Sequence, residues 1–130
     1  MEVTLFKYFA FASLIDSKNL LKMPLTLYSD RRSPMVRAVV LFMKANGVEF
    51  EEVETDFMKG DHKANKNIPA QTLPTLMVDG HGQEDSIYSQ STTILRYLGT
   101  RHANAESWYS DLRIRFKVDE FFDLFQVGQR

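Results

Sequence analysis

Two short segments carry polar side chains where a folded chain could present them to a ligand. Ser33 follows a polar stretch and precedes Pro34, so it suits the N-cap of a helix with Pro34 in the first helical position. Gln90 and Ser91 open another helical segment, where free backbone amides and the helix macrodipole favour an anion such as a carboxylate. On the residues alone, a simple capping role for Ser91 is the more economical interpretation, and anion binding is the alternative.

A proline at the entrance to an expected strand is a third feature of interest. Pro74 follows Leu73 in the run Gln-Thr-Leu-Pro-Thr-Leu, and a proline there cannot donate an amide hydrogen bond to a sheet. A cis peptide bond is one solution, but only about one X-Pro bond in twenty is cis in folded proteins. Spacing by itself therefore favours an ordinary trans proline. The polar, irregular stretch before it, residues 59–71, is a candidate binding segment.

Composition excludes several kinds of chemistry. The chain has no cysteine, so disulfides, zinc-thiolate sites and C-x-x-C redox pairs are excluded, and any thiol chemistry must use a thiol from the ligand. His62, His81 and His102 are widely spaced and show no helical pairing, so we expect no metal site. Lys and Arg number 16 against 17 Asp and Glu, a balance that provides no long-range attraction for nucleic acid or an anionic membrane.

The elements that must position these residues alternate between strand and helix. We expect the helix that starts at Ser33 to be a core helix, buried on more than one side and stopped by Asn46-Gly47. The acidic residues of the strand near 50–54 are interpreted as a solvated edge. The expected order is β-α-β-(α)-β-β-α, with strands near 25–28, 50–54, 75–78 and 85–88 and helices over 35–45 and from Ser89 or Ser91 to about Arg101.

The two ends of the chain differ from this central pattern. Residues 4–15 are apolar but too short to span a bilayer, and Glu2 and Lys7 argue against a signal peptide. We interpret residues 1–22 as an extension, disordered or absent from the mature chain, and expect a cytoplasmic protein. From Ser107 onward large apolar residues recur at helical spacing and demand a partner surface; they are Trp108, Leu112, Phe116, Val118, Phe121, Phe122 and Phe125.

Taken together, these segments resemble the glutathione transferase family, and in particular its theta-like class, which uses a serine. The run from Leu27 to Val39 is similar to the family's first strand, loop and helix, with Ser33 at the position of the catalytic serine. Lys59-Gly60-Asp61-His62 is similar to the Lys-Gly-x-His of that class. A third similarity is to the start of the family's second domain, and it is carried by Trp108, Tyr109, Arg113, Arg115, Val118, Asp119 and Glu120.

The resemblance implies a fold and a site. The fold would be α/β, a thioredoxin-like glutathione-binding domain over 23–102 followed, over 103–130, by a linker and the first helix of an all-α domain. Ser33 would face the sulfur of glutathione as the catalytic residue. The remaining implied contacts are Leu73 with the cysteinyl part, a structural cis bond at Pro74, Gln90 and Ser91 with the γ-glutamyl end, and His62 and Thr72 with the glycyl end.

The resemblance also implies a reaction and partners. Glutathione would be a co-substrate, with no other cofactor and no metal, and its thiolate would attack a hydrophobic electrophile in a detoxification reaction. A full-length member would form a homodimer, with no membrane span and no nucleic-acid partner. Because the chain would stop inside the first helix of the second domain, we expect either a fragment or a reduced relative that binds glutathione. The alternative function is a non-catalytic glutathione-binding or protein-assembly module of the same fold.

Overall fold

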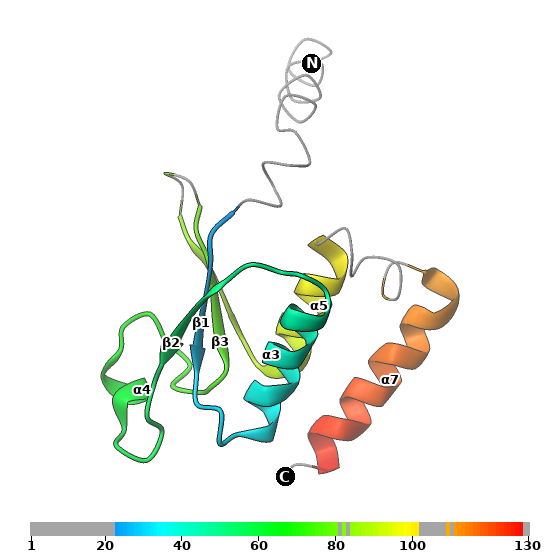
Figure 1. The fold of residues 1–130 in the computed structure, drawn as a ribbon. Coiled ribbons are helices and arrows are strands. Elements are labelled where there is room, and N and C mark those ends of the chain that lie inside the picture. Colours follow the sequence, from blue (N-terminus) through cyan, green and yellow to red (C-terminus); the bar gives the residue numbers. More distant parts are fainter. Residues whose placement is uncertain (1–22, 81, 83, 102–108, 110, 129–130) are drawn as a thin grey trace, which may run out of the picture.

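The computed structural model describes residues 23–80, 82, 84–101, 109 and 111–128, and its centre is a four-stranded mixed sheet (Figure 1). The strand order is β2-β1-β3-β4. β1 runs parallel to β2, with Leu27 opposite Glu52, and antiparallel to β3, which in turn pairs antiparallel with β4. The elements are β1 (Leu25–Ser29), α3 (Pro34–Ala45), β2 (Glu51–Glu54), α4 (Asp61–Ala64), β3 (Thr75–Val78), β4 (Ser86–Ser89), α5 (Ser91–Arg101) and α7 (Leu112–Gly128).

This order confirms the β-α-β-α-β-β-α arrangement expected from the sequence. β1 is buried nearly throughout because it lies inside the sheet, whereas β2 lies at the edge and exposes Glu51 and Glu54. The predicted end of α3 is also confirmed: Asn46 is its C-cap, and Gly47 follows with a φ of 66°, a conformation that glycine adopts without steric cost.

The hydrophobic core lies between the sheet and the two helices α3 and α5, which stand side by side against it in Figure 1. α3 contributes one apolar stripe to this core, formed by Val36, Val39, Val40 and Met43. Burial of α3 on more than one side, as the sequence suggested, is wrong for the described structure, since Leu41 is 70% exposed. The rest of the core comes from Leu25, Leu27, Val48, Leu76, Val78, Ile94 and Leu98.

Helix α7 lies outside α3 and α5, and polar contacts attach it to α5. Arg96 Nε donates to Asp119 Oδ1 at 2.9 Å, and the Tyr109 hydroxyl donates to the same oxygen at 2.9 Å. The Arg96 guanidinium also lies 5.2 Å from the centre of the Phe122 ring, which is itself buried. The other large apolar residues of α7 are less covered, and Leu112, Phe116, Phe121 and Leu124 are each more than 60% exposed. Trp108 falls outside the described residues.

An apolar groove separates α7 from α3 and α5. Its volume is about 750 Å³. Its walls include Leu41 and Phe42 of α3, Leu95 of α5, and Ile114 and Phe121 of α7. The predicted need of this terminal helix for a partner surface is therefore met only in part among the described residues. None of the described helices combines the length and the apolar character needed to cross a bilayer.

The Asp119 contacts predict how firmly α7 is held. Asp119→Ala removes the acceptor of both the Arg96 and the Tyr109 hydrogen bonds, and we expect it to weaken the attachment of α7 by about 1 kcal/mol. Amide hydrogen exchange should accelerate in α7 and stay unchanged in β1 and β3. Asp123→Ala is the matched control, because Asp123 is 3.6 Å from Arg96 and its side chain is 80% exposed. Equal exchange in α7 for both variants would contradict the prediction.

Candidate functional site

Ser33 ends the tight loop that joins β1 to α3. The loop closes with a hydrogen bond from the Ser33 amide to the Asp30 carbonyl at 3.0 Å, and Ser33 occupies the predicted N-cap position with φ −74° and ψ 129°. Its side chain nevertheless makes no capping hydrogen bond to the helix. The predicted N-cap position of Ser33 is therefore confirmed, but without the side-chain hydrogen bond that N-cap serines commonly make. The hydroxyl is left available at the N-terminus of a twelve-residue helix, where the macrodipole favours negative charge.

A pocket of about 410 Å³ opens beside Ser33. The structure brings Ser33 and Leu73 together in its lining, although 40 positions separate them in the chain. The Leu73–Pro74 peptide is cis, which is the geometry that the family resemblance implies and not the trans bond that spacing alone favoured. Phe57 and Met58 supply an apolar wall and are both exposed, and Asp30 and Arg32 complete the lining.

The other four predicted ligand contacts lie outside the lining of this pocket. Gln90 immediately precedes α5 and is exposed, with a φ of 74° that is uncommon for a residue with a side chain. Ser91, the first residue of α5, is 2% exposed. Thr72 precedes Leu73 and is half-buried, and among the described residues its Oγ1 is a buried atom without a hydrogen-bond partner. Strained backbone at a conformation such as that of Gln90 is typical of ligand-binding sites.

His62 is buried behind the apolar wall. It lies in α4, is 3% exposed, and stacks on Phe57 with 4.4 Å between ring centres. Its Nδ1 has no hydrogen-bond partner within the described part of the chain. Phe57 belongs to the lining of the pocket beside Ser33, whereas His62, on which it stacks, does not. His81 and His102 fall outside the described residues, and no group of three potential metal ligands occurs among those that the structure describes.

A buried carboxylate in the loop before Ser33 was missed by the sequence interpretation, which treated residues 29–32 only as a polar turn. Asp30 is 7% exposed and accepts hydrogen bonds from the amide of Phe57 at 3.1 Å and from the amide of Arg32 at 3.1 Å. Arg32 Nε also donates to Asp30 at 2.8 Å, and Arg32 Nη2 donates to its second oxygen. The Arg32 guanidinium and then the Phe57 amide hold the pKa of Asp30 far below its ordinary value.

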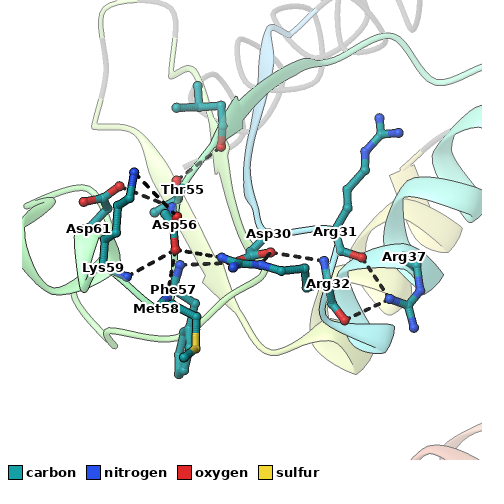
Figure 2. Close-up of polar contacts among 11 residues, drawn as sticks. Asp30, Arg31, Arg32, Arg37, Thr55, Asp56, Phe57, Met58, Lys59 and Asp61 are labelled. Atoms are coloured by element: carbon teal, nitrogen blue, oxygen red, sulfur yellow. Dashed lines mark hydrogen bonds and ion pairs between the residues drawn. The ribbon is translucent and has the colours of Figure 1, made fainter.

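Arg32 connects this loop to the turn that follows β2, as Figure 2 shows. Its Nη2 donates to Asp56 Oδ1 at 2.7 Å, and the same oxygen accepts the amides of Met58 at 2.9 Å and Lys59 at 3.2 Å. A sequence signal for this contact existed. Asp30 and Asp56 each follow one of two neighbouring parallel strands, and the carboxyl ends of such strands meet at one edge of the sheet.

A second ion pair joins β2 to the loop that follows β1. Glu52 accepts a hydrogen bond from the Ser29 hydroxyl at 2.7 Å and bonds from Arg31 at 2.8 and 2.5 Å. The interpretation of all acidic residues of β2 as a solvated edge is therefore wrong for Glu52. The Arg31 guanidinium, helped by the Ser29 hydroxyl, lowers the pKa of Glu52 to about 2.

These carboxylates predict sensitivity to acid. The folded-state pKa of Glu52 lies below its ordinary 4.5, so its contribution to stability is complete above about pH 4.5 and is lost as the pH falls toward 2. Asp30 acts in the same direction and loses its contribution at still lower pH. We expect the midpoint of urea unfolding to fall as the pH is lowered from 5 to 2.

Glu52→Gln isolates the contribution of Glu52, because it keeps an acceptor for Ser29 and Arg31 but cannot titrate. The urea midpoint of this variant should depend less steeply on pH below about 4.5 than that of the wild type. Glu51→Gln, on the exposed face of the same strand, is the control and should leave the slope unchanged. If the urea midpoints of Glu52→Gln and the wild type depended on pH equally steeply, the ion pair of Glu52 with Arg31 would not contribute to the acid sensitivity of the fold.

The fold and the pocket together define a class of protein. A four-stranded mixed sheet in the order β2-β1-β3-β4, two helices on its core face and a cis-proline that enters β3 make a thioredoxin-like domain. A family model described as the N-terminal domain of glutathione S-transferase matches residues 27–106. The chain belongs to this family.

The relatives are enzymes of the theta class and structures of related classes. The chain is 38% identical over 103 residues to glutathione S-transferase theta-2 of Homo sapiens, a match that covers 76% of this chain and 40% of that protein. It is 36% identical over 100 residues to the human theta-1 enzyme, with 76% and 41% covered. The chain thus spans about two fifths of the length of these curated relatives.

Solved structures agree with these matches. The structure of human glutathione transferase theta-2, in complex with glutathione and an unknown ligand, superposes with a TM-score of 0.65 at 36% identity and covers 77% of this chain and 41% of that one. An epsilon-class glutathione S-transferase from the housefly, Musca domestica, gives a TM-score of 0.64 at 33% identity, with 74% and 44% covered. The thioredoxin-like fold is therefore shared with glutathione transferases of more than one class.

Proposed function

We propose that this chain is the glutathione-binding part of a glutathione transferase and that Ser33 stabilises the thiolate of bound glutathione. One observation carries the proposal: Ser33, whose hydroxyl makes no capping hydrogen bond to its helix, lines the same pocket as Leu73, next to a cis-proline. The human theta-2 relative was solved with glutathione bound. A peptide with a thiol and two carboxylates suits a site in which helix N-termini supply the positive potential.

Ionisation of the thiol is the step that the pocket would assist. A free thiol has a pKa near 8.5, so only a few per cent is thiolate at pH 7, and the thiolate is the nucleophile. The Ser33 hydroxyl would donate a hydrogen bond to the sulfur anion, and the N-terminus of α3 would favour the same charge. Both interactions are stronger for the thiolate than for the thiol, so they lower the pKa of the bound thiol.

The remaining contacts extend this placement along glutathione. The backbone of Leu73 would pair with the cysteinyl part, and Gln90 with Ser91 at the start of α5 would hold the γ-glutamyl carboxylate and amine. Thr72 and His62 would meet the glycyl end. Since the Phe57 ring covers His62, that last contact requires Phe57 to turn outward, and its 53% exposure leaves it room to do so.

The same proposal covers the protein as a whole. Residues 23–102 would form the glutathione-binding domain, residues 1–22 an extension, and residues 103–130 a linker and the first helix, α7, of an all-helical domain. The complete protein would conjugate glutathione to hydrophobic electrophiles in detoxification, as a cytoplasmic homodimer. The exposed apolar residues of α7 support a further packing partner for this helix.

Binding to immobilised glutathione tests the proposal. The full chain should be retained on the resin, released by free reduced glutathione, and should form the thioether product with a hydrophobic electrophile faster than glutathione does alone. Ser33→Ala should be retained but should lose most of this acceleration. Failure of the wild-type chain to bind would overturn the proposal. Retention and release without any acceleration would support the alternative, a non-catalytic glutathione-binding module.

A further inference from the structure

Arg32 spans the pocket wall immediately beside Ser33. Its guanidinium contacts Asp30, in its own loop, and Asp56, in the turn after β2, and its side chain belongs to the lining of the pocket (Figure 2). Asp30 is buried, whereas the Arg32 side chain is 59% exposed and therefore accessible from the pocket. One cation is thus shared between two carboxylates at the place where a thiolate would form.

The charges around this cluster are balanced only when Arg32 is included. Lys59 Nζ lies 4.0 Å from Asp56, and the Asp56 amide donates to Asp61. Arg37 of α3 donates to the carbonyls of Arg31 and Arg32 beneath the loop, and Arg31 itself is paired with Glu52. The described charged groups that face the cluster are three anions, Asp30, Asp56 and Asp61, three cations, Arg32, Arg37 and Lys59, and the ion pair of Arg31 with Glu52.

We propose that Arg32 neutralises the carboxylates of Asp30 and Asp56 at the pocket wall, so that a further anion, the thiolate of bound glutathione, can form beside Ser33. This inference rests on the proposed function and adds a second residue to it. Without Arg32, the cluster would carry one more negative charge than positive, because Asp30 would lose its arginine partner and Asp56 would keep Lys59 at 4.0 Å. Such an excess of negative charge disfavours a new anion. Arg32 would act through the charge of its guanidinium and not through transfer of a proton.

A purely structural role for Arg32 predicts pKa shifts of a different sign from those that our proposal predicts. Arg32→Leu removes a positive charge and should raise the pKa of a thiol in the pocket. Asp56→Asn removes a negative charge and should lower it. If Arg32 only ties the two loops together, both substitutions break the same tie and should shift the pKa in the same direction. Arg32→Lys keeps the charge with fewer donors and should stay close to the wild type under our proposal.

The absence of cysteine from the chain allows the test to be made without glutathione. The substitution S33C places a single thiol at position 33, and the pH dependence of its alkylation by iodoacetamide gives its pKa. We expect Arg32→Leu in the S33C chain to raise this pKa by about one unit, and Asp56→Asn to lower it by a measurable fraction of a unit. Arg32→Lys should restore most of the S33C value. The urea midpoint of each variant, measured in parallel, establishes that it is folded.

The outcomes separate this inference from the proposed function. Shifts in the same direction for Arg32→Leu and Asp56→Asn, or no shift in either, would overturn the role of Arg32. If Arg32→Leu does not fold, Asp56→Asn still decides, because a raised or unchanged pKa in that variant contradicts the proposal. Binding of reduced glutathione to the wild-type chain is measured separately, so that its absence overturns the proposed function while the S33C titration still reports the charge balance at position 33.

Discussion

Replacing Ser33 by alanine is expected to raise the pKa of the thiol of bound glutathione by about one to two units. A hydrogen bond to a charged group contributes about 1.5–3 kcal/mol, and each pKa unit corresponds to about 1.4 kcal/mol. The Ser33 hydroxyl makes no capping bond in the structure, so its removal should cost the helix little. Ultraviolet absorbance of the thiolate, followed as the pH of the complex is raised, measures the change directly.

The pH dependence identifies the origin of the effect. Below the pKa of the bound thiol in the wild type, Ser33→Ala should hold roughly 10- to 100-fold less thiolate, and this ratio should shrink between the two pKa values. Above the pKa of the variant the two proteins should converge, because the thiolate then forms without the hydroxyl. Ser86→Ala, an exposed serine on β4, is the matched control and should match the wild type. A pKa that Ser33→Ala does not change would remove Ser33 from the mechanism.

Leu76→Ala is expected to have the largest effect on stability. Leu76 is fully buried at the middle of β3, between Leu27 of β1 and Tyr88 of β4. Removal of such a side chain leaves a cavity among neighbours that cannot close it, and typically destabilises a protein by about 2–5 kcal/mol. The free energy of unfolding from urea titration measures this change.

Ile87→Ala provides the matched comparison for Leu76→Ala. Ile87 lies on the adjacent strand β4 and is 37% exposed. We therefore expect Ile87→Ala to lower the free energy of unfolding by less than half as much as Leu76→Ala does. Because β3 starts directly after Leu73 and Pro74, we also expect Leu76→Ala to weaken glutathione binding more than Ile87→Ala does. Equal losses of stability in the two variants would contradict the core that the structure shows.

The order of the elements could be predicted from the sequence because local signals were strong. Pro34 at the start of α3 and Asn46-Gly47 at its end have conformational preferences that few other structures satisfy. Burial was predicted less well. The apolar run of α3 suggested contacts all round, yet Leu41 is exposed, because hydrophobicity alone does not state which neighbours are present.

Site residues that belong to a family motif could be predicted from the sequence, whereas contacts between residues far apart in the chain could not. Ser33 and Leu73 were expected together from the family resemblance, and the structure places both in one pocket. The pairing of Arg32 with Asp56 joins residues 24 positions apart. Sequence periodicity does not reveal such a contact, although the parallel arrangement of β1 and β2 would have brought the two loops together.

The central claim is that the Ser33 hydroxyl faces the sulfur of glutathione, and a crystal structure of the full chain with reduced glutathione tests it most directly. We predict that the sulfur lies within hydrogen-bonding distance of Ser33 Oγ, with the cysteinyl backbone paired to Leu73. A glutathione molecule bound with its sulfur beyond reach of Ser33 Oγ, with the hydroxyl turned toward the amides of α3, would contradict this claim.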